Sequence, residues 1–163
     1  MSFDVRSDQA PFVDSIFYSE LKKYYSHDEY SKIADDLNKD GFGVVDLRLE
    51  GNIIDQANID INNAIKKNNF KRNAETYHYN ESPRIVEGWK FSPALKNIAT
   101  NKKLIDILNF CYQSEPIPMS TINFLKGTEQ PLHSDEFHYG TIPHRYLTGV
   151  WVALEDINPD SGP

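Results

Sequence analysis

The sequence lacks features that mark several large classes of protein. It has a single cysteine, Cys111, among 163 residues, which excludes an internal disulfide and a zinc site built from several thiolates. Its 24 acidic residues outnumber its 17 basic ones, giving a formal net charge of −7. Because phosphate contacts dominate nucleic-acid affinity, we expect no nucleic-acid partner for an acidic chain without a basic stripe.

Long hydrophobic runs are also missing. No stretch reaches the roughly 20 apolar residues that a membrane helix needs, and the N-terminus has no apolar segment of signal-peptide length. We therefore expect a cytoplasmic protein that does not bind membranes. Nine Tyr, nine Phe and two Trp among its residues are enough for a packed core, and the length predicts a single domain over residues 1–163.

Helical periodicity dominates the first two thirds of the chain. A helix is predicted between the candidate N-cap Ser26 and the stop signal Gly41. Apolar stripes predict two more helices at 53–67 and 102–112. Cys111 lies in the last stripe, which indicates a buried small side chain rather than a reactive thiol.

Strand-like patterns are concentrated in the last third. Residues 118–125 and 146–154 are predicted strands, as is the short apolar run 42–47. Helices followed by strands indicate an α+β fold or helices packed on a barrel. The turn signal at 158–162 is followed by no strand that could cover the sheet edge, so we expect the chain to be the N-terminal part of a longer protein.

His133 and Asp135 are the clearest candidate metal ligands. In extended chain, residues i and i+2 project from the same face, so one ion could take an imidazole nitrogen and a carboxylate oxygen from them. With a second histidine they would form the facial triad of non-haem Fe(II) oxygenases, which leaves positions open for other ligands. The spacing alone is also met by unrelated surface loops.

Ordered motifs around this pair resemble the phytanoyl-CoA dioxygenase family. They are Asp40-Gly-Phe-Gly-Val-Val, Gly88-Trp-Lys90, the run Gly127–Tyr139 that holds His-x-Asp, and the run Gly149–Pro163 with its apolar-Trp-apolar-Ala-Leu strand pattern. The resemblance covers about residues 38–163. It implies a double-stranded β-helix, or jelly-roll barrel, supported by N-terminal helices at about 27–112, with barrel strands from about 118.

The resemblance also implies an activity and its site. The expected protein is an Fe(II)- and 2-oxoglutarate-dependent dioxygenase that hydroxylates a small organic substrate, with His133 and Asp135 as iron ligands. The family's second histidine and its 2-oxoglutarate-binding arginine lie near the end of the barrel, beyond Pro163. The 163-residue chain is therefore expected to be inactive alone.

Asn123 and Trp151 are the predicted cofactor-binding residues. In ectoine-hydroxylase-like members an asparagine at the matching strand position holds 2-oxoglutarate, and the residue at the position of Trp151 lies beside this co-substrate. The small neighbours Gly149 and Ala153 leave space beside the Trp151 ring. An ordinary core tryptophan and a strand asparagine bonded to backbone are the structural alternatives.

Two other functions compete with the oxygenase. A non-catalytic jelly-roll module that binds a small molecule or a protein has the same fold. A zinc hydrolase would add His138 or His144 to the pair, but no carboxylate is placed as an obvious base for a bound water.

Overall fold

The computed structural model describes residues 9–67, 78–79, 82–124 and 133–161. The chain divides into two compact units, each built from three stretches of sequence. The first unit comprises Met1–Leu47, Lys102–Ile117 and Ser134–Val150; the second comprises Arg48–Asn101, Pro118–His133 and Trp151–Pro163. Each unit has a hydrophobic cluster of its own, and the single domain over 1–163 stays a prediction.

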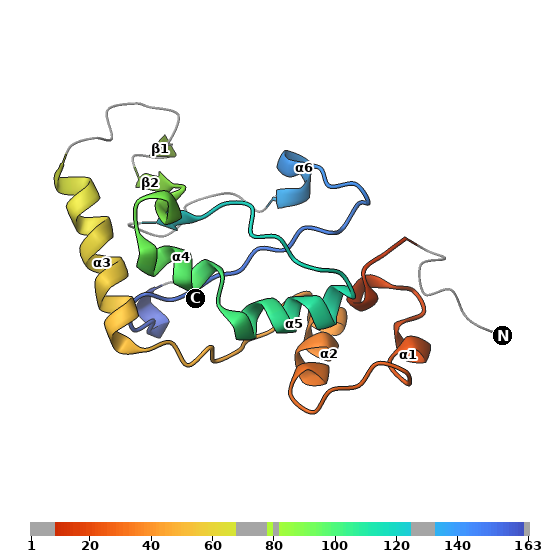
Figure 1. Cartoon of the computed structure of the whole chain (residues 1–163). Coiled ribbons are helices and arrows are strands. Elements are labelled where there is room, and N and C mark those ends of the chain that lie inside the picture. Colours follow the sequence, from red (N-terminus) through yellow and green to blue (C-terminus); the bar gives the residue numbers. More distant parts are fainter. Residues whose placement is uncertain (1–8, 68–77, 80–81, 125–132, 162–163) are drawn as a thin grey trace. The chain divides into compact units, whose positions relative to one another are not determined.

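Two helices form the centre of the first unit. Helix α2 (Tyr30–Asp40) packs against α5 (Lys102–Tyr112), and the two lie side by side in Figure 1. A 3-10 turn, η1 (Phe12–Asp14), contacts both of them, and α1 (Tyr18–Leu21) contacts this turn. The short helix α6 (Asp135–Tyr139) also belongs to this unit.

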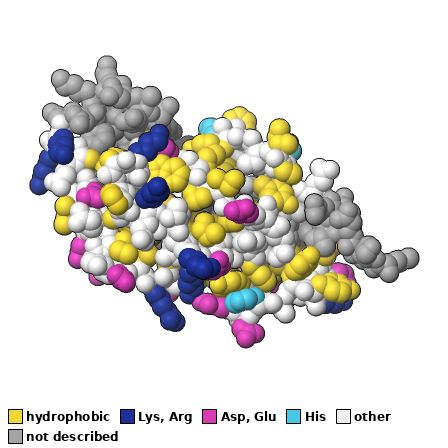
Figure 2. All heavy atoms as spheres, viewed as in Figure 1, with side chains coloured by type: hydrophobic (Ala, Val, Ile, Leu, Met, Phe, Trp, Pro, Cys, Tyr) yellow, Lys and Arg dark blue, Asp and Glu magenta, His cyan; other side chains and the backbone are white. Residues whose placement is uncertain are grey.

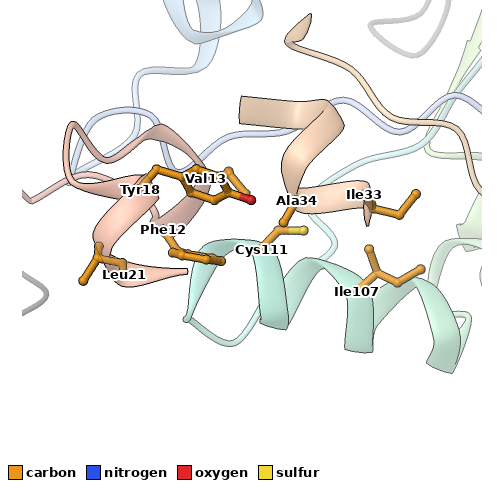
Figure 3. Packing of buried hydrophobic residues seen from close by; sticks show 8 residues of the cluster. All are labelled: Phe12, Val13, Tyr18, Leu21, Ile33, Ala34, Ile107 and Cys111. Atoms are coloured by element: carbon orange, nitrogen blue, oxygen red, sulfur yellow. The ribbon is translucent and has the colours of Figure 1, made fainter. Parts of the chain in front are cut away.

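Small side chains let α2 and α5 approach closely. Ala34 on α2 and Cys111 on α5 are almost completely buried, and Figure 3 shows the cysteine pointing toward the alanine. Phe12 covers the end of this contact, with its ring centroid 4.9 Å from Tyr18 and 5.9 Å from Phe110. The prediction that Cys111 is a buried core residue is therefore confirmed.

The ends of α2 are set by local signals. Gly41 ends the helix in the left-handed conformation, at φ 79°, as predicted. The start differs from the prediction: the helix begins at Tyr30 rather than just after Ser26. The ring of His27 accounts for this start, because its Nδ1 accepts hydrogen bonds from the backbone N–H groups of Glu29 and Tyr30 at 3.2 and 3.3 Å.

The second unit combines two helices with a small antiparallel sheet. The elements are α3 (Gly51–Lys66), β1 (His78–Tyr79), β2 (Ser82–Val86), the 3-10 turn η2 (Gly88–Lys90), α4 (Pro93–Ala99), β3 (Ile122–Phe124) and η3 (Pro159–Ser161). Helix α3 packs against α4, and the strands pair in the order β1-β2-β3 (Figure 1).

A buried serine joins the two helices of this unit. Ser92 is fully buried, and its Oγ accepts a hydrogen bond from the N–H of Leu95 at 3.1 Å, which caps α4. The same hydroxyl donates to Oδ2 of Asp60 on α3 at 2.6 Å. Pro93 occupies the first turn of α4, where no N–H is needed.

The helical predictions were more accurate than the strand predictions. The helices at 53–67 and 102–112 are confirmed as α3 and α5. The strands predicted at 42–47 and 146–154 are wrong, because neither segment forms strand pairing with another described segment. Of the strand predicted at 118–125, only β3 forms; residue 125 lies outside the described residues.

The sheet and helices together agree with an α+β fold. The strands of the described ranges form an open sheet rather than a barrel. Helix α4 and strand β2 were not predicted, because residues 68–90 have no clear period and α4 is only seven residues long. No helix in the described part of the chain is long and apolar enough to cross a membrane.

Several large hydrophobic side chains remain on the surface. Figure 2 shows such side chains on the drawn face, between charged ones. The most exposed are Ile142, Phe137 and Ile117, at 97%, 88% and 84%. Single exposed apolar residues are normal in soluble domains.

Gly88 occupies a position where a side chain does not fit. A Cβ there would lie 2.6 Å from Cδ1 of Leu95 and 2.7 Å from Oδ1 of Asn123. We predict that Gly88→Ala lowers the free energy of unfolding by about 1–3 kcal/mol, measured by urea denaturation. Gly51→Ala is the matched control, since nothing lies within 4 Å of its Cβ, and it should be neutral or slightly stabilising. An equal effect of both substitutions would contradict this account.

Burial should make Cys111 unreactive in the folded protein. Loss of solvation raises the pKa of its thiol to about 11, so the nucleophilic thiolate is scarce at pH 8. We predict slow reaction with Ellman's reagent in buffer and complete reaction in urea. A thiol introduced at the exposed Ser26, as Ser26→Cys, should react at once; equally fast reaction of Cys111 would mean that it is accessible.

Candidate metal-ligand pair and its surroundings

The two predicted metal ligands lie on either side of a unit boundary. His133 is the last residue of its stretch in the second unit, and Ser134 begins the next stretch of the first unit. Both His133 and Asp135 are exposed. The residue between them, Ser134, is extended, with φ −109° and ψ 127°. The assignment of the pair to iron stays a prediction.

Local signals place Asp135 at the first position of a helix that was not predicted. Asp135 and Glu136 form the acidic first turn of α6, where carboxylates are favoured. Gly140 ends the helix in the left-handed region, at φ 48°. Ser134, the two acidic residues and the glycine are helix signals that can be read from the sequence.

A glycine leaves room beside the Asp135 carboxylate. The carboxylate oxygen Oδ2 lies 3.6 Å from the position that a Cβ on Gly149 would take. The segment that contains Gly149, although it is not a strand, therefore runs past the predicted ligand. A large side chain at this position would compete with the carboxylate for space.

Asn123 points into the second unit from the middle of β3. Its neighbour across the sheet is Ile85, which is 1% exposed and belongs to the core. Its side-chain oxygen Oδ1 is buried and has no hydrogen-bond partner within the described structure, and it lies beside Gly88. Asn123 therefore lies on the face of β3 that is directed toward the core.

Trp151 packs against Phe124, the residue that follows Asn123 in β3. Its ring is 70% exposed and stacks on the ring of Phe124, with centroids 6.5 Å apart and planes 20° apart. The guanidinium of Arg84, which pairs with Phe124 across the sheet, lies 5.1 Å from the same ring. Trp151 is thus a surface aromatic residue rather than ordinary core.

The two predicted cofactor residues contact opposite faces of β3. Successive side chains of a strand project in opposite directions, so Asn123 and Phe124 point to different sides. Trp151 contacts Phe124, whereas Asn123 contacts Gly88 and the core. The structure therefore places Asn123 and Trp151 on opposite sides of β3.

The other histidines make contacts of their own. His138 packs edge-on against Phe137, and Nδ1 of His144 lies 3.7 Å from Oε1 of Glu136. Among the residues that the structure describes, no group of three or more His, Cys, Asp or Glu is arranged to hold a metal ion. A surface hollow of about 280 Å³ is lined by residues that include Asp14, His144 and Arg145.

The donor types present suit iron. An imidazole nitrogen and a carboxylate oxygen are two of the three ligands in a non-haem Fe(II) facial triad. His133 and Asp135 therefore fit part of such a centre by their chemistry.

Comparisons with known proteins identify the family. Residues 19–163 match the model of the family described as phytanoyl-CoA dioxygenase (PhyH). A search of curated proteins and a search of solved structures gave no match. The match spans nearly the whole chain, including both predicted metal ligands, and the chain therefore belongs to the phytanoyl-CoA dioxygenase family.

Proposed function

We propose that the protein is an Fe(II)- and 2-oxoglutarate-dependent dioxygenase that hydroxylates a small organic substrate. The family is one of dioxygenases. The observation that carries the proposal is the His133-Ser-Asp135 sequence inside the family match. In the proposed fold, a double-stranded β-helix, the open sheet of β1, β2 and β3 would be part of the barrel.

In this proposal His133 and Asp135 supply two protein ligands to the metal. The extended backbone of Ser134 favours projection of both side chains from one side of the chain. Bound iron would supply the oxidising chemistry that inserts oxygen into a C–H bond, while the chain's own residues orient the reactants and limit access of water.

Asn123 and Trp151 are the proposed contacts of 2-oxoglutarate. The Oδ1 of Asn123 is buried and has no partner in the described structure. A carboxylate accepts hydrogen bonds, so the Nδ2 group of the amide would be the donor to 2-oxoglutarate. The exposed ring of Trp151 offers an apolar wall.

The two residues contact opposite faces of β3, so they can be tested separately. The KM for 2-oxoglutarate is compared in Asn123→Ala and Trp151→Ala. The substitution that raises this KM identifies the residue in contact with the co-substrate.

Loss of either metal ligand should abolish turnover. We predict that His133→Ala and Asp135→Ala eliminate Fe(II)-dependent formation of succinate from 2-oxoglutarate by the protein. Each substitution should also weaken the binding of Co(II) by at least about 10–100-fold, because even the loss of a residue that only supports a ligand lowers metal affinity by that much. Binding of Co(II) is measured by its absorption spectrum. The exposed His138 provides the control His138→Ala, which should retain both properties.

The same experiment separates the competing functions. Wild-type turnover by Asp135→Ala would refute the assignment of the ligands. Loss of metal binding in His138→Ala would instead favour a local three-ligand centre of the zinc type. A wild-type protein that binds a small molecule or another protein, but forms no succinate from 2-oxoglutarate, would support the non-catalytic module.

A further inference from the structure

Glu87 holds an unfavourable backbone conformation at the end of β2. Its φ of 60° and ψ of 36° lie in the left-handed region, which residues other than glycine rarely adopt. Such residues persist only where the surrounding structure determines the conformation, and they are concentrated at functional sites. The contacts of Glu87 show what keeps it there.

The side chain and the backbone of Glu87 join two separate segments. Its Oε1 accepts a hydrogen bond from the Ser120 hydroxyl at 2.6 Å, and its Oε2 accepts one from the indole N–H of Trp89 at 2.9 Å. Lys90 forms an ion pair with Oε2 at 3.1 Å. The backbone N–H of Glu87 donates to the carbonyl of Thr121 at 2.7 Å. One residue thus ties the turn after β2 to the segment that enters β3.

Electrostatics favour the ionised form of this residue. The hydrogen bonds from Ser120 and Trp89 hold the pKa of Glu87 below its ordinary value, and Lys90 acts in the same direction. A carboxylate accepts charge-assisted hydrogen bonds, which are stronger than those of a neutral amide. A Glu87→Gln variant should therefore weaken the connection without changing the size of the side chain.

The connection made by Glu87 fixes the surroundings of Asn123. Gly88, the next residue, lies so close to Asn123 that a Cβ there would be 2.7 Å from its Oδ1. The backbone N–H of Trp89 also donates to Oγ1 of Thr121, two residues before Asn123, at 3.3 Å. Any movement of the η2 turn away from β3 would therefore change the space around the Asn123 amide.

We propose that Glu87 is a positioning residue that holds the η2 turn against β3 and thereby sets the orientation of the Asn123 amide for 2-oxoglutarate. The inference rests on the proposed function, in which Asn123 contacts this co-substrate. Glu87 itself acts through Gly88 and Thr121 rather than by touching the reactants.

A second left-handed residue provides a matched control. Gln113 has φ 49° and follows α5 on the surface, where its side-chain amide donates a hydrogen bond to the nearby backbone carbonyl of Phe110 at 2.7 Å. Glycine at either position relieves the backbone. We therefore expect Gln113→Gly to leave the urea midpoint unchanged or to raise it, whereas Glu87→Gly should lower it because the connection to Ser120 and Trp89 is lost.

The decisive experiment compares Glu87→Gln and Ser120→Ala with the wild-type protein. The indole N–H resonance of Trp89, assigned with Trp151→Phe, should shift in Glu87→Gln because its acceptor changes. The KM for 2-oxoglutarate should rise about tenfold, corresponding to one weakened charge-assisted hydrogen bond, with kcat little changed. Ser120→Ala should show a smaller rise in KM.

The outcomes distinguish the inference from the proposed function. An unchanged KM for 2-oxoglutarate in Glu87→Gln, whether or not kcat falls, would overturn the positioning role. Turnover of 2-oxoglutarate by the wild-type protein would in that case still support the oxygenase. Absence of 2-oxoglutarate turnover in wild type would overturn the proposed function, and the inference with it. An increase of KM in Gln113→Gly equal to that in Glu87→Gln would also overturn it, because the effect would then follow any change at a left-handed residue.

Discussion

The antiparallel pairing of β2 with β3 is the constraint on which most of the candidate site depends. The register places Ile85 opposite Asn123 and Arg84 opposite Phe124. Because side chains alternate along a strand, this register sends Asn123 toward the core and Phe124 toward Trp151. A slip by one residue would exchange the two faces. The surroundings of every proposed co-substrate contact therefore follow from a few backbone hydrogen bonds.

Polar groups hold the ends of this short sheet and its helices in place. Ser92 joins α4 to α3 through Asp60, and Glu87 joins the η2 turn to Ser120. Buried polar groups are costly unless they are hydrogen-bonded, so the bond of the buried Ser92 specifies the arrangement of the two helices as well as stabilises it. Asn123 differs from Ser92, because its buried Oδ1 has no partner in the described structure.

The candidate metal ligands depend more on local chain conformation than on the core. Their types and spacing could be predicted because the imidazole and the carboxylate are neighbours in sequence. The start of α6 at Asp135 has local signals as well. The closeness of Gly149 to the Asp135 carboxylate could not be predicted from them, since it joins segments that a loop separates. The role of Glu87 also depends on contacts with residues more than thirty positions away.

The sequence by itself determined the elements whose hydrogen bonds are local. The apolar stripes predicted α3 and α5, Gly41 predicted the end of α2, and the ordered motifs around His133 predicted the family. Tertiary structure decided the rest. Residues 146–154 have a clear strand pattern but no strand partner in the described ranges, and Asn123 turns toward the core because Ile85 lies opposite it. A helix satisfies its backbone within one segment, whereas a strand and a buried amide need partners that only the folded chain brings to them.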